Sequence, residues 1–339
     1  MSEFTLAAAL VGIRAPLDLI EIQLPQLRKN QVLLEMYSAS ICGSQVSEWQ
    51  GGRDNAKWLP HLMGHEGFGI VSAIGPGVQN FRVGQPVIAS WISNGLEPSE
   101  PPLYRSRDGK EIGAGKVAIF ARRAIVSQDK IYRIQDFSLF PDSSLFSLLG
   151  CAFPTGAGMV FQIPSLSHSS KVLLKGVGGV GGATAIALNE VHSGEKFAFD
   201  RNVSRHVFAQ NLGFKVLSEK EIRRDYFDIV FDNTGDIDSL QDSFLSLSNH
   251  GTLVFASHPP IGSRLSIDPY RILEGRSLIG TWGGGIKSQQ DFDILISRFS
   301  EKGKIAKLAG PKFMFSEINE AMEYSKNPDQ GRAILIMSN

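Results

Sequence analysis

Three residues of this sequence have side chains that could hold a transition metal at a reactive site. Cys42 and Cys151 are the two cysteines of the chain, and His65 lies between them in Gly64-His65-Glu66. Two thiolates and one imidazole can bind zinc tetrahedrally and leave the fourth position for a substrate oxygen. Each residue also has a common structural role, since a buried free cysteine packs as a small hydrophobe. The residue types alone therefore make a catalytic zinc site a candidate.

A second candidate site is the glycine-rich stretch that follows the apolar residues 172–174. Gly176, Gly178 and Gly181 have the G-x-G-x-x-G spacing. In that motif the glycines allow a tight turn, a close approach of backbone to a pyrophosphate, and close packing of helix on strand. Residues 183–188 favour a helix, whose first N–H groups would face the phosphates. The stretch predicts a strand, a phosphate-binding turn and a helix.

Asp200 completes this pattern. It ends the next apolar run, residues 197–199, and an acid about 20 residues after the first glycine can accept hydrogen bonds from an adenosine ribose. A glycine-rich turn without a ligand is the alternative, but the whole strand–turn–helix–strand–acid order favours a dinucleotide. The carboxylate favours NAD because it repels a 2′-phosphate, whereas Arg201 and Arg205 nearby could accept one.

Length and composition narrow the class of protein. At 339 residues the chain is too long for one ordinary core, which predicts two domains. Formal net charge is zero, with 34 basic and 34 acidic residues, so neither nucleic acid nor an anionic membrane is an expected partner. No stretch approaches the roughly 20 apolar residues of a membrane span. The start of the chain lacks a signal-peptide pattern, and two cysteines fit a reducing cytoplasm.

The elements that would position these residues fall into two regions. Up to about residue 150 the sequence is β-rich, with runs such as residues 31–36 broken by turn residues. Beyond it, strand-like runs alternate with helical sequence, as at 227–232 and 251–256, which indicates an α/β unit. The end of the chain predicts two amphipathic helices and a closing strand, at residues 291–299, 316–324 and 333–337.

Several motifs in a consistent order surround the candidate residues. They are Cys42-Gly43-Ser44, Gly64-His65-Glu66-Gly67 with Gly69, Gly75 with Gly77-Val78, Val83-Gly84 with Val87, Gly150-Cys151, Thr155-Gly156, the glycine run 176–181, Asp200 and Gly331-Arg332-Ala333. With these motifs the chain resembles, over essentially its whole length, the zinc-dependent alcohol dehydrogenases of the medium-chain dehydrogenase/reductase superfamily.

This resemblance implies an α/β fold of two domains. A GroES-like, β-rich catalytic domain would comprise residues 1–152 and 282–339. A Rossmann domain with a doubly wound parallel sheet would comprise residues 153–281 and bind NAD(P). In that family the active site lies in the cleft between the two domains.

The resemblance also implies roles for individual residues. The metal ligands would be Cys42, His65 and Cys151, and the catalytic residues would be Ser44, which takes the substrate's proton, and Glu66, a carboxylate behind the metal. The cofactor-binding residues would be Thr155, Gly176, Gly178, Gly179, Val180, Gly181, Asp200, Arg205 and Arg332, the last at a phosphate. Substrate-pocket positions, with a looser alignment, are Trp49, Trp91, His258, Thr281 and Trp282. Core packing is an equally good interpretation of Trp49.

Three departures from the family pattern matter. Residues 93–116 lack the four cysteines of the frequent structural-zinc lobe, so we expect that lobe to be absent or remodelled. Gln45 stands where many relatives have an acid that orients the zinc-binding histidine; an amide oxygen can accept the same N–H without charge. Ser47 stands in the Val46-Ser47 segment, where some members have a histidine that extends the proton relay.

These observations predict a cytoplasmic oxidoreductase that transfers a hydride between a small-molecule alcohol and NAD(P), giving a ketone or aldehyde. One catalytic Zn²⁺ and NAD, with NADP as the alternative, are the expected cofactors. The charged residues Arg105, Arg107 and Asp108 keep polyol, cyclitol or sugar-type substrates among the candidates. A homodimer or homotetramer is the family expectation.

Two other functions stay open. A zinc-free NADPH-dependent quinone or enone reductase of the same superfamily would need no metal, but such members typically lack both cysteines and the His-Glu pair. A catalytically silent cofactor-binding protein could lose metal ligands freely, yet here both cysteines stand at thiolate positions. The metal content of the purified protein would distinguish these two functions from that of a zinc-dependent dehydrogenase.

Overall fold

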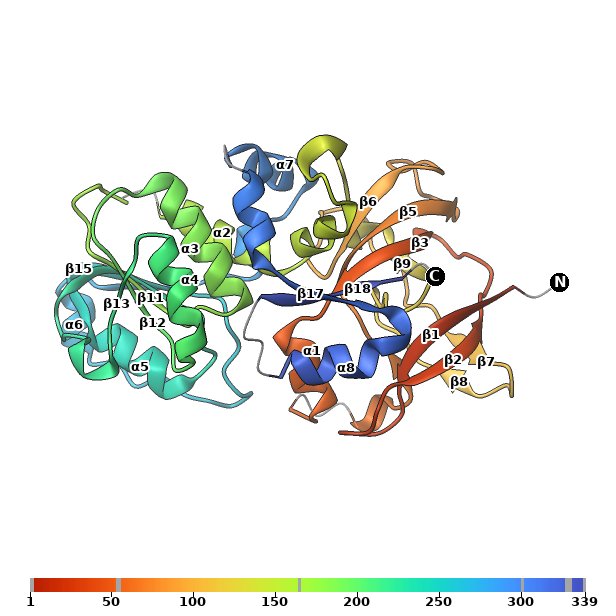
Figure 1. Cartoon of the computed structure of the whole chain (residues 1–339), viewed down its shortest axis with the longest axis horizontal. Helices are drawn as coiled ribbons and strands as arrows, with labels where there is room; N and C mark the ends of the chain where they lie inside the picture. Colours follow the sequence, from red (N-terminus) through yellow and green to blue (C-terminus); the bar gives the residue numbers. More distant parts are fainter. Residues whose placement is uncertain (1–2, 53–55, 164–165, 300–301, 327–330, 338–339) are drawn as a thin grey trace. The chain divides into compact units, whose positions relative to one another are not determined.

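The chain divides into two compact units (Figure 1). The structure is a computed structural model that describes residues 3–52, 56–163, 166–299, 302–326 and 331–337. The first unit comprises residues 1–151, 287–296 and 306–339. The second comprises residues 152–286 and 297–305. Each unit is built around its own sheets.

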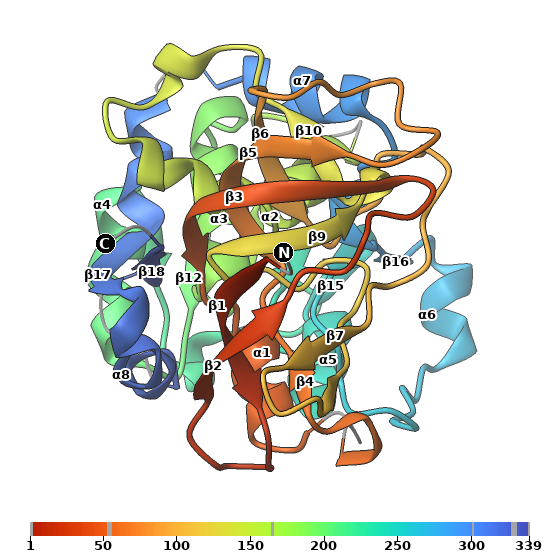
Figure 2. The same ribbon diagram turned by 90° about the vertical axis from the view of Figure 1, so that its right-hand side faces the viewer.

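The first unit is β-rich. One of its sheets has the strand order β4 (His61–Leu62), β1 (Phe4–Leu10), β2 (Asp18–Gln23), β7 (Tyr104–Ser106) and β8 (Glu111–Ile112). Another has the order β10 (Ile131–Arg133), β6 (Pro86–Ser90), β5 (Glu66–Ile74), β3 (Gln31–Ser40), β18 (Arg332–Ile336) and β17 (Ala309–Met314), with β9 (Arg123–Ser127) also paired to β3. Figure 2 shows β6, β5 and β3 side by side, with β9 along the other side of β3.

Strand β3 holds this second sheet together because it pairs with β5, β9 and β18. Its apolar side chains Val32, Leu34 and Met36 are buried in the main hydrophobic core of the unit. Helix α8 (Ile318–Tyr324) adds Ile318, Ala321 and Met322 to the same core, and α1 (Gly43–Trp49) adds Val46 and Trp49. Helix α7 (Gln289–Ser297) belongs mostly to the same unit and packs through Phe292, which stacks on Tyr132 at 4.6 Å between ring centroids.

The second unit is a parallel sheet. Its strand order is β13 (Lys215–Val216), β12 (Lys196–Phe199), β11 (Val172–Lys175), β14 (Phe227–Asp232), β15 (Leu247–Phe255) and β16 (Ser277–Gly280), and every neighbouring pair is parallel. This is the doubly wound order in which the chain steps outward from β11 in both directions. The helices are α2 (Ala152–Phe161), α3 (Gly179–Val191), α4 (His206–Asn211), α5 (Ile237–Leu245) and α6 (Pro269–Leu273).

The direction of the crossovers fixes which helices cover which face. Parallel crossovers are right-handed, so the step from β11 to β12 through α3 and the step from β14 to β15 through α5 place these helices on opposite faces. The sequence prediction of a GroES-like β-rich domain joined to a Rossmann sheet is confirmed. The amphipathic helices and closing strand expected at the chain's end are α7, α8 and β18.

The glycine turn after β11 shows why its glycines are required. Gly176 has a φ of +81°, which a side chain would strain. Gly181 lies so close to the turn that a Cβ there would be 1.8 Å from the carbonyl oxygen of Gly176. The N-terminus of α3 is therefore pressed against the end of β11, as the motif predicts.

The segment 93–116 forms a hairpin instead of a cysteine-rich lobe. Strands β7 and β8 pair with each other, and β7 extends the first sheet by pairing with β2. Tyr104 is buried, and its hydroxyl accepts a hydrogen bond from the N–H of Ile125 at 2.8 Å. Burial of this ring anchors the hairpin.

Within the described part of the chain, no single helix is long and apolar enough to cross a membrane. The bent pair Ser143–Leu149 and Ala152–Phe161, which meet at 53°, reaches the required length and apolarity only when the two are taken together.

Candidate metal centre and dinucleotide site

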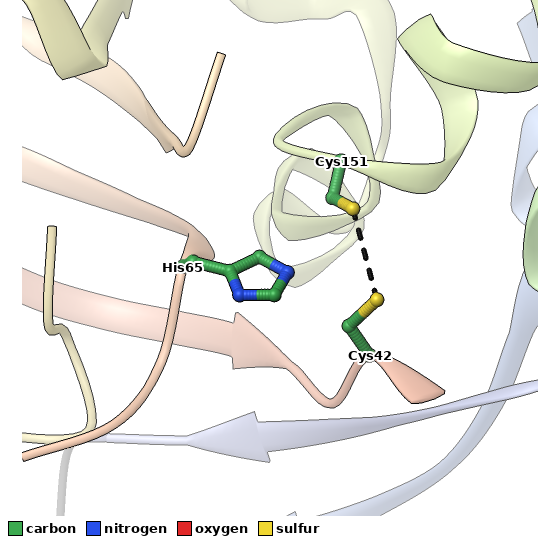
Figure 3. A group of neighbouring side chains, drawn as sticks. All are labelled: Cys42, His65 and Cys151. Atoms are coloured by element: carbon green, nitrogen blue, oxygen red, sulfur yellow. Dashed lines mark hydrogen bonds between the residues drawn. The ribbon is translucent and has the colours of Figure 1, made fainter. Parts of the chain in front are cut away.

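Cys42, His65 and Cys151 come together in the first unit. Cys42 follows β3 and directly precedes α1, His65 directly precedes β5, and Cys151 precedes α2. Their metal-binding atoms all lie within 4.8 Å of one another. Figure 3 shows the imidazole ring of His65 directed toward the two sulfur atoms. The ends of three elements thus place the residues that the sequence singled out in one cluster.

The cluster has the properties of a metal site. The two Sγ atoms are 3.7 Å apart, far beyond the about 2.05 Å of a disulfide, and both cysteines are free and buried. Nε2 of His65 is buried and has no hydrogen-bond partner among the described residues. A buried polar atom without a partner costs about 1–3 kcal/mol, which a metal bond would relieve. Two sulfurs and one imidazole fit Zn²⁺.

The two thiols are electrostatically unequal. The hydrogen bond from Cys151 lowers the pKa of Cys42 well below the usual thiol value, against the opposing effect of burial. The same hydrogen bond, together with burial, raises the pKa of Cys151. Of the two thiols, Cys42 therefore loses its proton more readily. Binding of a metal to both sulfurs would release the protons that remain on them.

Arg332 and Glu66 form a buried ion pair beside these sulfurs. The Arg332 guanidinium contacts the two carboxylate oxygens of Glu66 at 2.9 and 3.3 Å, and both residues are buried. The negative charge of Cys42 also attracts the guanidinium. The expected contact between Arg332 and a cofactor phosphate remains a prediction, because the side chain is engaged by Glu66 in this structure.

Gln45 has a different partner from the one the sequence indicated. Its side-chain oxygen accepts a hydrogen bond from the backbone N–H of Cys42 at 2.9 Å, which closes a capping interaction at the start of α1. Its Nε2 is buried without a hydrogen-bond partner among the described residues. The amide therefore holds the Cys42 backbone, and its oxygen does not orient His65.

Trp49 and Trp91, the two tryptophans of this unit expected near the substrate, lie in different environments. Trp49 belongs to the hydrophobic core, and its Nε1 donates to the carbonyl of Ala15 at 2.6 Å. Trp91 is half-buried and donates its Nε1–H to Sγ of Cys151 at 3.1 Å. Ser44, in the first turn of α1, is half-buried, and its hydroxyl has no protein hydrogen-bond partner among the described residues.

In the second unit, Asp200 lies at the end of β12 and joins the glycine turn. One carboxylate oxygen accepts the N–H of Val177 at 2.6 Å, and the other accepts the N–H of Asn202 at 2.8 Å. Arg205 approaches the carboxylate to 3.2 Å and lies over Gly178, where an added Cβ would be 3.6 Å from the guanidinium. A carboxylate has about four acceptor sites, and Arg205 contacts both oxygens, at 3.2 and 3.5 Å, so a ribose hydroxyl would take the place of an Arg205 contact.

Other predicted cofactor residues lie on α2 and α3. Thr155 is buried on α2, and its hydroxyl oxygen has no hydrogen-bond partner among the described residues. Val180 lies in the first turn of α3, where its carbonyl would be 2.1 Å from a Cβ placed on Gly156. The close approach of α2 to α3 at Gly156 explains why a glycine follows Thr155.

The remaining predicted substrate residues are also in the second unit. The rings of His258 and Trp282 pack edge to face, with centroids 4.9 Å apart, and Trp282 is 69% exposed. The Thr281 hydroxyl accepts a hydrogen bond from Gln162 at 2.9 Å. His258 therefore lies beside Trp282, which directly follows Thr281, although His258 is distant from both in the sequence.

Sequence reasoning missed Asn233. It directly follows β14, and both polar atoms of its side-chain amide are buried without a partner among the described residues. Its Cβ would be 3.6 Å from a Cβ added at Gly181. The available signal was a polar residue at the carboxyl end of a buried strand, the edge where ligands of doubly wound sheets bind.

The chain combines a β-rich unit that holds the Cys–His–Cys cluster with a second unit that has the Rossmann strand order. Comparison with known proteins finds the same fold in alcohol dehydrogenases. Residues 28–136 match the family described as the alcohol dehydrogenase GroES-like domain. Alcohol dehydrogenase 6 of Peromyscus maniculatus is 24% identical over 367 residues, covering 97% of this chain and 97% of that protein.

Solved structures show the same fold. An alcohol dehydrogenase zinc-binding domain protein from Burkholderia ambifaria superposes with a TM-score of 0.86 at 21% identity, covering 100% of both chains. Benzyl alcohol dehydrogenase from Acinetobacter calcoaceticus gives 0.84 at 21% identity, covering 99% of this chain and 100% of that chain. The chain thus shares the fold of these dehydrogenases over its whole length, and residues 28–136 carry the alcohol dehydrogenase GroES-like domain.

Proposed function

We propose that this protein is a zinc-dependent, NAD(P)-linked dehydrogenase that interconverts a small alcohol and its carbonyl compound. The observation that carries the proposal is the cluster of Cys42, His65 and Cys151, whose metal-binding atoms lie within 4.8 Å of one another. A zinc-free reductase has no use for this donor set. The buried, unpartnered Nε2 of His65 adds to the argument, because it would be costly without a ligand.

Bound Zn²⁺ would act as a Lewis acid on the substrate oxygen, and the nicotinamide would accept or return the hydride. Ser44 takes the proton of the substrate hydroxyl, since its own hydroxyl is half-buried and has no protein partner among the described residues. Glu66 and Arg332 balance each other's charge behind the metal ligands. Asp200 accepts hydrogen bonds from the adenosine ribose while it holds the glycine turn through Val177.

The test begins with protein purified without chelators. We expect elemental analysis to find one zinc per chain, and we expect NAD to be reduced when primary and secondary alcohols are supplied. Active protein without metal, or a content of about two zincs per chain, would contradict the proposal. Protein that binds zinc and NAD but turns over no alcohol or carbonyl compound would favour the catalytically silent alternative.

The charged residues that kept polyol and sugar-type substrates among the candidates have partners of their own. Arg105 pairs with Glu111 at 3.0 Å, and Arg107 pairs with Glu21, all on the exposed hairpin or the adjacent strand. The Asp108 carboxylate accepts a hydrogen bond from Ser106. The charges of this segment thus have local partners, and a panel of substrates should include simple aliphatic and aromatic alcohols.

We expect NAD to be preferred over NADP, with Asp200 responsible. Replacing Asp200 by Ala should narrow or invert the preference, because ribose hydrogen bonds and repulsion of the 2′-phosphate are both lost. Asp200→Asn keeps an acceptor for the N–H of Val177 and removes the charge, so it should shift the preference in the same direction with less disturbance of the turn. The measurement is kcat/KM with each cofactor.

Wild-type protein that uses NADP at least about tenfold more efficiently, a difference of about 1.4 kcal/mol, would overturn this assignment. Arg205 and Arg201 would then be the phosphate-binding residues. Arg201 is exposed and pairs with Asp236 at 3.3 Å, so it can be tested separately from the Arg205 contact with Asp200.

A further inference from the structure

The indole of Trp91 makes a direct contact with the candidate metal centre. Its Nε1 lies 3.1 Å from Sγ of Cys151. An indole N–H can only donate a hydrogen bond, so the sulfur is the acceptor. The contact is thus an N–H···S hydrogen bond to a proposed metal ligand, made by a residue that the sequence analysis predicts at the substrate pocket.

The backbone holds Trp91 in this position. The Lys130 ammonium donates to the Trp91 carbonyl at 2.9 Å. Ser90, the last residue of β6, donates its hydroxyl to the carbonyl of Gly150 at 2.6 Å. The residue before Trp91 is therefore tied to the residue before Cys151. Gly150 packs so tightly here that a Cβ would lie 2.4 Å from the carbonyl of Ala89.

The two proposed sulfur ligands share one charged neighbour and differ in one hydrogen bond. The positive charge of Arg332 acts on both Cys42 and Cys151. Cys151 accepts the neutral indole N–H of Trp91. A buried thiolate needs hydrogen bonds to offset its lost hydration, and Trp91 supplies one to Cys151. Partners of this kind hold a metal ligand in place and tune the metal.

We propose that Trp91 is a positioning residue for the metal centre, acting through its N–H···S hydrogen bond to Cys151. The inference rests on the proposed function, because it requires metal at Cys42, His65 and Cys151. The hydrogen bond withdraws electron density from the Cys151 sulfur, so a metal bound there would be a stronger Lewis acid. It also fixes the direction of the Cys151 side chain before metal arrives.

The test replaces zinc by Co²⁺ in the full-length protein and compares wild type with Trp91→Phe, which keeps an aromatic ring and removes the N–H. We expect the sulfur-to-cobalt charge-transfer band to move to longer wavelength in the variant, because the sulfur lone pair rises in energy without its donor. We also expect metal affinity, measured by chelator competition, to fall by about tenfold, the lower end for partners of metal ligands.

Trp58→Phe is the matched control. Trp58 is 59% exposed, with Lys57 over its ring at 5.2 Å, and it makes no contact with the cluster among the described residues. Its cobalt spectrum and affinity should match wild type. If Trp91→Phe folds but also matches wild type, the proposal is wrong while the metal site stands. If the wild-type protein binds no cobalt at the cluster, both the role of Trp91 and the proposed zinc-dependent function are wrong.

A second measurement needs no variant. In protein loaded with ¹¹³Cd and carrying ¹⁵N-labelled tryptophan, the indole proton of Trp91 should show a scalar coupling to cadmium through the hydrogen bond and the sulfur. The other tryptophans, at 49, 58 and 282, should show none. A Trp91 signal without this coupling in cadmium-loaded protein would overturn the proposal, even if the phenylalanine variant fails to fold.

Discussion

Cys151→Ala should lose its metal and its dehydrogenase activity together. The substitution removes one of the three donor atoms that lie within 4.8 Å of one another, and the remaining Cys42 and His65 cannot complete a stable zinc site. Zinc content should fall from one per chain to near zero. Turnover should fall by about 10³-fold or more, since Lewis-acid stabilisation is worth several kcal/mol.

The second unit should be unaffected, because the glycine turn and Asp200 hold each other through contacts within that unit. The affinity for NAD, measured by calorimetry, should therefore stay within about threefold of wild type. Cys42→Ala is the matched variant, since both sulfurs are buried to a similar extent, at 8% and 6% exposure. It should give the same result.

Three outcomes would contradict the assignment. One is a Cys151→Ala protein that keeps a full complement of zinc, which would place the metal elsewhere. Another is a variant that loses zinc and keeps its turnover, which would make the metal structural. The last is loss of metal from Cys151→Ala and not from Cys42→Ala, which would exclude Cys42 as a ligand.

The glycine turn illustrates what a sequence can predict. Its spacing encodes local geometry, because Gly176 needs a positive φ and Gly181 has no room for a Cβ. The buried strand before it and the acid after the next strand lie within one short supersecondary unit. Constraints between residues close in the sequence determine which residue types are allowed at each position. The parallel sheet could be predicted from the pattern that they produce.

The partners of the metal cluster show what could not be predicted. Trp91 and Cys151 are 60 residues apart, and Arg332 and Glu66 are 266 apart. The donor to each sulfur is set by how the end of β6 packs against Gly150 and Cys151. This packing joins segments that are distant in the sequence, so no local sequence pattern predicts it. Gln45 is the converse case, in which a short-range bond to the Cys42 backbone replaces the expected contact with His65.

Ser44→Ala should reduce kcat by about 10²–10⁴-fold, the usual contribution of general acid–base catalysis. Ser44 follows Cys42 by two residues in the first turn of α1, so we expect its hydroxyl to reach the oxygen of a metal-bound substrate. Ser44→Thr keeps a hydroxyl at the same carbon and should retain most of the rate. Zinc content and NAD affinity should stay near wild type in both variants.

A purely structural role for Ser44 predicts a different result. Serine often hydrogen-bonds its own turn, and its loss would then lower stability while folded protein turned over normally. In this helix, however, Gln45 caps the Cys42 N–H, and the Ser44 hydroxyl has no protein partner among the described residues. Ser47→Ala, one turn further along α1, is the matched control and should turn over at the wild-type rate.

The deciding measurement is kcat per zinc-loaded, folded chain. Normalising in this way separates a lost proton acceptor from lost metal or lost fold. A Ser44→Ala variant within about threefold of wild type would fall far short of the range for proton transfer and would end the assignment. A threonine variant as slow as the alanine variant would show that the hydroxyl alone is insufficient, because the added methyl group would then displace it from the substrate oxygen.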